Sequence, residues 1–298
     1  MDDAYYHIAL TPAQQSLISS VTPFRFRPIS SPSSSPSTAD PVLIEPFLPL
    51  PLPSSPRLPS TLSLILTPPR PSDLPAQLSC LNDPRVGLSL VGPPYPYTEE
   101  HGREFGRTKA GGAEEYFGRV GGLAQALLDG GEGRVEEFVK SVKEGKELPR
   151  EWLPNGCPVN AIRREDTDEW VGDLGTMRWL YEDVEDAQER ERLAKENLAR
   201  EVGDPELAWS FGFFLHPTYH SLGLMSPCLS TLLKTVFMSF LRCHQIHGAA
   251  FADNHASLRT QEKNGLVKYG RWVRDVAEAR GGGRKEVVVL KWEKGDQE

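Results

Sequence analysis

Cysteine is scarce in this 298-residue chain, and the four that occur stand far apart, at Cys80, Cys157, Cys228 and Cys243. None of them has the short spacing to another cysteine that marks a metal-binding or redox pair. The sequence also lacks a secretory signal, because it begins Met-Asp-Asp rather than with a basic and then apolar segment. We therefore predict reduced thiols in a cytoplasmic protein, and the same features leave the nucleus open as a location.

Two further absences limit the partners. The net charge is −8 at pH 7, so a basic face for nucleic acid is not expected, whereas an acidic surface favours cationic partners such as amines. No apolar run is long enough to cross a membrane, since "PVLIEPFLPLPLP" at residues 41–53 is interrupted by Glu45 and by prolines. The composition predicts neither nucleic acid nor a membrane as a partner.

Proline and serine are concentrated at one end of the chain. Residues 1–60 hold 12 of the 26 prolines and 12 serines, and such a segment forms few regular hydrogen bonds and gains little from burial. We expect residues 1–60 to be a disordered tail and residues 61–298 to form one folded domain.

The rest of the chain alternates between short apolar runs and amphipathic stretches, which is typical of a mixed α/β domain. Strands are expected at residues 62–66, 158–165, 170–181, 207–215 and 248–253, with a final antiparallel pair at 266–276 and 286–292. Helices are expected after a cap at Ser72 or Asp73 up to residue 81, from Thr98, and at 133–145, 183–202, 226–242 and 254–265.

The most regular helix follows the short turn "HSLGLM" at residues 220–225. Its apolar residues recur every three or four positions through Leu241, Ser226 is a candidate cap, and Pro227 suits the first helical position. Free backbone N–H groups at the start of a helix attract anions, and Gly223 permits a positive φ or the close approach of a ligand. These features alone fit a phosphate site and a plain strand-to-helix connection equally well.

The order of motifs resembles the GNAT superfamily of acyl-CoA N-acyltransferases, and more closely its branch that acetylates ribosomal-protein N-termini. The family carries [Q/R]-x-x-G-x-[G/A] between a strand and a helix, and His220, Gly223 and Met225 stand at the matching positions. The stretch "LILTPPRPSDLPAQL", the segment from Asn254 to Leu266 and the terminal "EVVVLKW" also match. The resemblance covers about residues 62–293, with insertions at 105–155 and 183–203.

The resemblance implies a mixed fold with a mostly antiparallel, splayed sheet, and acetyl-CoA as the co-substrate with no metal. It places the CoA pyrophosphate on the turn and the pantetheine arm along the preceding strand, and it adds Asn254 as a CoA contact. The implied CoA-binding residues are Phe213, Phe214, Leu215, His220, Ser221, Leu222, Gly223, Leu224, Met225, Ser226 and Asn254.

For catalysis, the resemblance implies that a hydroxyl at Ser257 stabilises the leaving thiolate. An alternative is that Ser257 caps its own helix backbone. Many relatives carry a Tyr seven residues after the Asn, where this chain has Gln261. His216 is the preferred general base, and Asp173 and Glu206 are the other candidates.

The implied acceptor is a primary amine, either a protein N-terminus or a small molecule, bound near residues 94–104 and 267–276. We expect a monomer or weak dimer. The alternatives are a CoA-binding protein of the same fold without efficient catalysis, and an interaction scaffold that uses the tail. The run from Cys243 to His247 lacks the second ligand pair of a zinc site, so no metal is expected.

Overall fold

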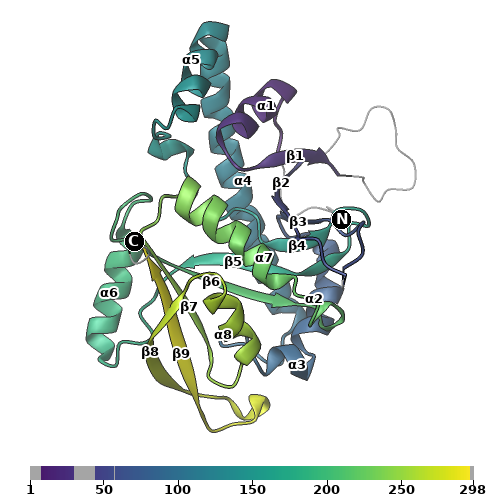
Figure 1. The fold of residues 1–298 in the computed structure, drawn as a ribbon, viewed down its shortest axis with the longest axis vertical. Helices are drawn as coiled ribbons and strands as arrows, with labels where there is room; N and C mark the ends of the chain where they lie inside the picture. Colours follow the sequence, from purple (N-terminus) through teal and green to yellow (C-terminus); the bar gives the residue numbers. More distant parts are fainter. Residues whose placement is uncertain (1–7, 30–43, 57, 296–298) are drawn as a thin grey trace.

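A computed structural model describes residues 8–29, 44–56 and 58–295 as one nine-stranded open sheet with helices on its faces and margins (Figure 1). The strand order is β1-β2-β3-β4-β5-β6-β7-β9-β8, and every neighbouring pair is antiparallel except β6 and β7. The strands are β1 Arg25–Pro28, β2 Ile44–Leu50, β3 Leu64–Thr67, β4 Ala161–Arg164, β5 Trp170–Arg178, β6 Ala208–Leu215, β7 Gln245–Phe251, β8 Val267–Asp275 and β9 Arg284–Glu293. The predicted mixed α/β class with a mostly antiparallel sheet is confirmed.

Eight α-helices connect the strands in the described ranges. They are α1 Pro12–Val21, α2 Leu74–Leu81, α3 Pro84–Gly87, α4 Glu99–Asp129, α5 Glu132–Lys143, α6 Ala187–Ala199, α7 Met225–Thr231 and α8 His255–Glu262. Helix α7 continues as a wider, π-type helix at Leu232–Phe240. Within the described ranges, none of these helices is both long enough and apolar enough to cross a bilayer.

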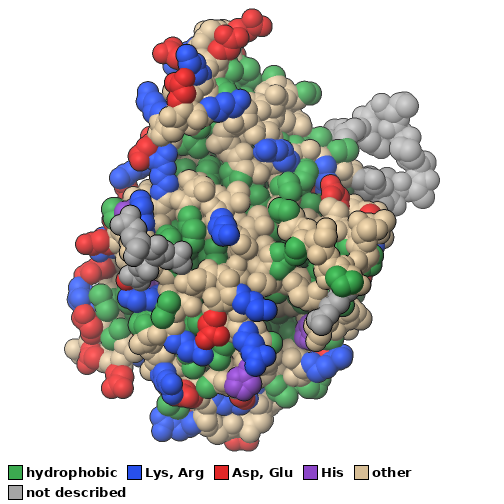
Figure 2. All heavy atoms as spheres, in the orientation of Figure 1, with side chains coloured by type: hydrophobic (Ala, Val, Ile, Leu, Met, Phe, Trp, Pro, Cys, Tyr) green, Lys and Arg blue, Asp and Glu red, His purple; other side chains and the backbone are tan. Residues whose placement is uncertain are grey.

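Helices α7 and α8 lie on one face of the sheet and α2 lies on the other (Figure 1). On the α7 face, the Trp209 ring of β6 packs against Phe237, with ring centroids 5.8 Å apart. On the α2 face, Cys80 and Leu81 pack with Trp170 of β5 and with Phe214 of β6. Charged residues of both signs gather along α5 and α6 at the margin (Figure 2), where ion pairs such as Arg192–Glu189 fit the prediction of a solvated helix.

The expected tail differs from the structure wherever residues 1–60 are described. Helix α1 begins with a capping box at Thr11, and Ile18 and Phe24 are fully buried in the core. Strand β2 extends the sheet beyond β3 although prolines occur within it, because residues 44–47 pair with β1 and residues 48–50 with β3, so each part has one side without a paired strand, where a missing N–H is tolerated. Residues 1–7 and 30–43 of the expected tail lie outside the described residues.

Glu45 attaches these early strands to the rest of the domain. It is fully buried, and Arg70 donates to its two carboxylate oxygens at 2.9 and 2.6 Å while Arg27 donates at 3.0 and 2.8 Å. Asp168, in the turn between β4 and β5, also bonds to both arginines. The residue that interrupts the apolar run is therefore a partner that the two arginines share, and removing its charge would leave both largely buried arginines with Asp168 as their remaining carboxylate.

Helix α4 is far longer than the expected helix that starts at Thr98. Thr98 does cap it, but the helix continues through the glycine-rich part of the expected insertion to Asp129. A Cβ at Gly102 would lie 2.3 Å from Leu74 Cδ1, so this glycine lets α4 pack closely on α2. Glycine here serves close packing, which a reading of glycine as a helix breaker does not anticipate.

Replacement of Phe24 tests whether the early segment belongs to the core. Its ring contacts Tyr116, Phe117 and Phe240 at centroid distances of 5.4–6.0 Å. Phe24→Ala should lower the free energy of unfolding by about 3–5 kcal/mol in urea titration. The half-buried Phe47 of β2 is a matched control, and Phe47→Ala should cost clearly less. Equal, small losses would mean that residues 8–29 do not contribute to the core.

Candidate functional site

Strands β6 and β7 run together for only three residues. Ala208, Trp209 and Ser210 pair with Gln245, Ile246 and His247. Beyond Ser210, β6 continues beside β5 as far as Leu215, and β7 continues beside β9 as far as Phe251. We call the place where the two strands diverge, between residues 211–215 and 248–251, the fork. It confirms the splayed sheet expected from the sequence.

The fork leaves backbone groups of β6 without a strand partner. The N–H of His216 donates to Val171 of β5, and because strand residues alternate in direction, Gly212 and Phe214 also face β5. Phe211 and Phe213 therefore direct their backbone groups toward β7, where the Ser210–His247 pair uses the N–H of Phe211 and leaves its C=O and both groups of Phe213 in the fork. The backbone of Phe214 is bonded to β5, and the Leu215 carbonyl accepts from His220 Nε2 at 2.9 Å, so the pantetheine contacts expected at these two residues stay predictions. The pantetheine contact expected at Phe213 remains available.

The turn after β6 presents several unpaired amides. Within the described part of the chain, the N–H groups of residues 221–226 make no backbone hydrogen bond. Ser221 and Gly223 have φ of 61° and 77°, and a left-handed residue within such a turn points successive N–H groups toward a common side, as in anion-binding nests. A Cβ at Gly223 would meet nothing within 4 Å, so the turn is open on its outer side.

The helix after the turn starts earlier than expected. It begins at Met225, and Leu224 is the cap residue without a side-chain bond. Ser226 does not cap the helix, because its carbonyl and its Oγ instead accept from Asn264 Nδ2 at 3.2 and 3.3 Å. This bond holds the end of α8 against the start of α7. Exposed Lys263 is next to Asn264, and Lys and Arg side chains gather over α8 (Figure 2), so positive charge lies beside the turn.

Asn254 is the N-terminal cap of α8. Its Oδ1 accepts from Ser257 N at 3.1 Å, and its Nδ2 donates to the Ser89 carbonyl at 3.1 Å. Both polar groups of the side chain thus have partners within the protein. The residue positions α8 against the loop after α3, and the CoA contact expected from its side chain stays a prediction.

Ser257 pairs with the residue that replaces the family's Tyr. Gln261 is 1% exposed, and its Nε2 donates to Ser257 Oγ at 3.2 Å. Because Ser257 Oγ accepts this bond, its own O–H can donate elsewhere. No bond from Ser257 Oγ to its own helix backbone occurs in the described structure, so the capping alternative is not what the structure shows.

His216 directly follows β6, at the end of the strand that leads into the turn. Its Nδ1 is 2.8 Å from Thr218 Oγ1, and it lines a hollow of about 310 Å³ with Arg70 and Arg163. Those arginines are engaged with carboxylates, including the buried pair of Arg163 with Asp73. The structure does not bring His216 and Ser257 together in a single contact, and His216 as the general base stays a prediction.

The other two base candidates have different surroundings. Glu206 is an exposed residue paired with Arg200 at the start of β6, the end opposite the turn. Asp173 is buried in β5 on the α2 face, and burial raises the pKa of its carboxyl to about 7, although Lys109 nearby acts to lower it. Asn160 Nδ2 donates to Asp173 at 2.5 Å. Asp173 is therefore the better placed of the two to exchange a proton near neutral pH.

The sequence did not predict the polar cluster that His247 forms with Tyr269 and Asp183. His247 is the last β7 residue paired before the fork, and its Nδ1 is 3.0 Å from Tyr269 Oη, which donates to Asp183 at 2.9 Å. The Tyr proton is thus used on Asp183, so Nδ1 carries the imidazole proton and Nε2 is a buried acceptor without a partner. Burial lowers the pKa of His247 to about 4 and keeps it neutral. Only its closeness to Cys243 had drawn attention to this residue, as part of a metal motif.

The cysteines and the described acidic and histidine residues offer little covalent or metal chemistry. Cys228, which lies in α7 close to the turn, is buried, and burial raises the pKa of its thiol to about 12. Burial has the same effect on the pKa values of Cys80, Cys157 and Cys243. Such thiols are poor nucleophiles near neutral pH. Within the described residues, no group of three or more His, Cys, Asp or Glu side chains is arranged to hold a metal ion.

The regions expected to hold the acceptor lie next to segments that contact each other. Arg280, at the tip of the β8–β9 hairpin, donates to the carbonyls of Leu90 and Pro93. The last hairpin and the loop before α4 therefore meet at the open end of the fork.

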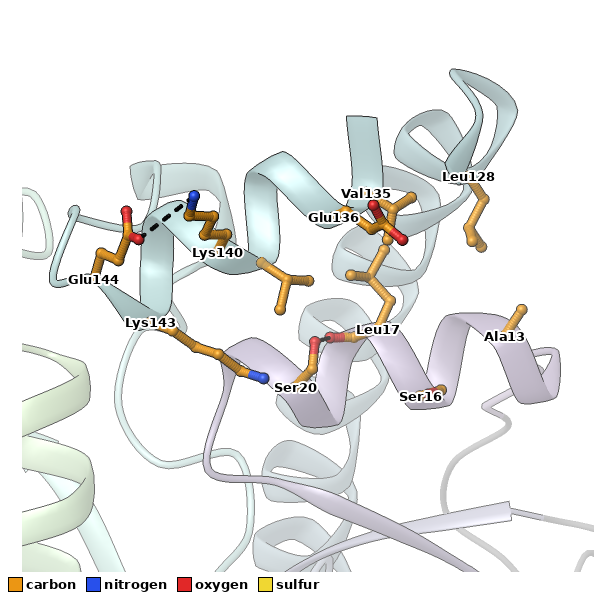
Figure 3. A pocket seen from close by; sticks show the side chains of 11 residues that line it. Ala13, Ser16, Leu17, Ser20, Leu128, Val135, Glu136, Lys140, Lys143 and Glu144 are labelled. Carbon is orange, nitrogen blue, oxygen red and sulfur yellow. Dashed lines mark hydrogen bonds and ion pairs between the residues drawn. The ribbon is translucent and has the colours of Figure 1, made fainter. Parts of the chain in front are cut away.

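A separate hollow of about 700 Å³ lies between α1, α4 and α5 (Figure 3). Leu17, Leu128 and Val135 point into it, and Lys140 and Glu144 form an ion pair at its rim. It holds no histidine, cysteine or unpaired buried carboxylate, so its size does not make it the better candidate for chemistry.

Comparisons with known proteins give structural matches alone. No protein-family model matches the sequence, and no curated protein matches it either. A GNAT-family acetyltransferase from Bacillus anthracis has a TM-score of 0.47 and 13% identity, over 77% of this chain and 94% of its own. RimL, a ribosomal α-N-protein acetyltransferase in complex with coenzyme A, has a TM-score of 0.43 and 14% identity, over 82% and 97%.

A third match is spermidine N-acetyltransferase from Vibrio cholerae, in complex with CoA and spermine, with a TM-score of 0.42 and 12% identity over 78% and 96% of the two chains. The chain is similar in structure to GNAT acetyltransferases. At these values the likeness concerns the fold, and any function has to be argued from the chain's own residues.

The buried Asp173 predicts a pH-dependent stability. The unfolded chain releases this proton near pH 4 and the folded chain near pH 7, so the folded state binds the extra proton between these values and its stability falls as pH rises through that window. Asp173→Asn should remove this loss and raise the free energy of unfolding at pH 8 by at most about 4 kcal/mol, with little change at pH 4.

Urea titrations at pH 4, 6 and 8 measure this effect, and exposed Asp129→Asn is the control that should leave the slope with pH unchanged. If Asp173→Asn lowered stability equally at all three pH values, Asp173 would be ionised in the folded state throughout.

Proposed function

We propose that the chain is an acyl-CoA-dependent N-acyltransferase that transfers acetyl from acetyl-CoA to a primary amine by direct attack. The observation that carries the proposal is a set of unpaired backbone groups in two nearby segments, the fork-facing side of β6 and the turn at residues 221–226. The first segment offers the C=O of Phe211 and both groups of Phe213, and the second offers the free amides of the turn.

These two segments suit the two ends of a CoA thioester. Amides at the start of the helix and the positive end of its dipole attract a pyrophosphate, and Lys263 adds positive charge beside them. The fork-facing groups of Phe213 match the amides of a pantetheine arm. We place acetyl-CoA here as a co-substrate that supplies the activated acyl group.

The chain's own residues would then support transfer in three ways. The fork-facing N–H of Phe213 can donate to the thioester carbonyl, and such a donor typically contributes ~3 kcal/mol. Ser257, with its Oγ already accepting from Gln261, can donate its proton toward the leaving sulfur. The amine loses a proton to a neighbouring base, for which Asp173 and His247 join His216 as candidates.

The position of His247 makes it a candidate for the general base. It lies where the fork closes, and Asp183 next to it has a buried Oδ1 without a partner in the described structure. Glu182 beside it also has a buried, unpartnered Oε2. Two such carboxylates on the face opposite α7 favour a cationic acceptor, in keeping with the acidic composition.

A catalytically degenerate CoA-binding protein is the second candidate. The observation that favours it is Gln261, which stands where many relatives carry an acidic Tyr hydroxyl and which cannot protonate a thiolate. CoA binding is common to both candidates, and only turnover separates them.

Titration calorimetry of the full chain with acetyl-CoA, CoA and dephospho-CoA tests the proposal. Wild type should bind acetyl-CoA with a dissociation constant in the micromolar range (about −8 kcal/mol). Gly223→Glu should abolish binding, because it adds a negative charge and a side chain at a positive φ on the open side of the turn.

Gly131→Glu is the matched control, because Gly131 also has a positive φ of 90° with nothing near its Cβ position, at the junction of α4 and α5. It should cost similar backbone strain and leave binding intact. A folded wild type that binds none of the three ligands would exclude both candidates. With binding established, release of free thiol across a set of amines decides between enzyme and binder.

A further inference from the structure

The closed end of the fork is filled by two side chains on the α7 and α8 face. Phe211 of β6 is 6% exposed and Gln261 of α8 is 1% exposed. Both lie against Gly248, the first β7 residue beyond the last pair with β6. A Cβ at Gly248 would lie 2.1 Å from Gln261 Oε1 and 2.9 Å from Phe211 Cζ. Only glycine leaves room at this position for both side chains.

Gln261 also carries an unusual polar atom. Its Nε2 is used on Ser257 Oγ, but its Oε1 is fully buried and has no hydrogen-bond partner in the described structure. Buried polar groups in native proteins are normally paired, so an orphan of this kind calls for an explanation. Its location beside Gly248 places this unpaired oxygen at the closed end of the fork.

Together these contacts set the depth of the fork. The pair of Ser210 with His247 closes the sheet behind the fork. The Phe211 ring stacks on the Phe213 ring, with centroids 6.1 Å apart. The Gln261 carboxamide is held by its bond to Ser257 Oγ. The side chains of Phe211 and Gln261 are therefore both buried and held in place. An acyl group that enters along β6 meets the ring and the carboxamide directly beyond the reacting carbonyl.

We propose that Phe211 and Gln261 restrict the acyl group to acetyl, so that the chain selects acetyl-CoA over longer acyl-CoA thioesters. This inference rests on the proposed function, because it places the acyl group in the same fork. Selection works by exclusion: each added methylene has to displace a buried ring or a carboxamide that is tied to Ser257, in an interior that has no spare volume.

Calorimetric titration of the full chain with CoA, acetyl-CoA, butyryl-CoA and hexanoyl-CoA tests the proposal. Wild type should bind acetyl-CoA about tenfold or more tightly than hexanoyl-CoA, the discrimination that misfit of methylenes in a packed pocket typically gives. Phe211→Ala and Gln261→Ala should each reduce this ratio to within about threefold by admitting the longer chain. The affinity for CoA without an acyl group should change least.

Two further variants separate volume from other effects. Phe214→Ala removes an equal ring from the same strand on the opposite face, where it packs with Trp170, and should keep the wild-type ratio. Gln261→Leu keeps the side-chain volume and loses the amide. It should also keep the ratio of acetyl-CoA to hexanoyl-CoA affinity, although acetyl-CoA itself should bind more weakly.

The outcomes distinguish this inference from the function on which it rests. Wild type that binds hexanoyl-CoA as tightly as acetyl-CoA overturns the inference while the N-acyltransferase proposal stands, and so does an unchanged ratio in folded Phe211→Ala and Gln261→Ala. Wild type that binds neither CoA nor any thioester overturns the proposed function and the inference with it.

Discussion

The early divergence of β6 from β7 is the constraint on which the candidate site depends. Strand β6 stays bonded to β5 along its whole length, so it cannot follow β7, and β7 is held equally firmly by β9. Beyond the pair of Ser210 with His247, the backbone groups of β6 and β7 that point toward each other have no strand partner. We propose that the ligand binds to these groups, because proteins normally pair their backbone N–H and C=O groups.

Helix α8 fixes the other side of this candidate site. Asn254 holds its start to the loop after α3, and Asn264 holds its end to Ser226 at the start of α7. Ser257 and Gln261 lie one turn apart on this braced helix and bond to each other. The turn, the fork and the polar pair on α8 are therefore set relative to one another by side-chain amides rather than by apolar packing alone.

The sequence predicted what depends on local pattern. The apolar runs identified β3, β5, β6 and the β8–β9 hairpin, and the cap at Thr98 located the start of α4. It failed where packing decides: the prolines and serines of residues 1–60 suggested disorder, yet two arginines distant in the chain make the segment around Glu45 part of the sheet. Likewise, Gly102 of α4 has a packing role that only its neighbour Leu74 reveals.

The site shows the same division. The turn and Ser257 follow from the order of motifs along the chain, because a strand, a turn and a helix are local features. The role of Gln261 depends on Gly248 and Phe211 from two other strands, and the bond between His247 and Tyr269 crosses the sheet to β8. No spacing in the sequence encodes those contacts, so they could not be predicted from it.

The most direct test of this account is amide hydrogen exchange of the full chain, followed by mass spectrometry with and without acetyl-CoA. The account predicts slower exchange in peptides that cover residues 211–226 and 254–264, and unchanged exchange in α5 and α6, because the free amides of the fork and the turn would become bonded to the ligand. Protection confined to other segments, or no protection with saturating acetyl-CoA, would contradict a CoA site at the fork.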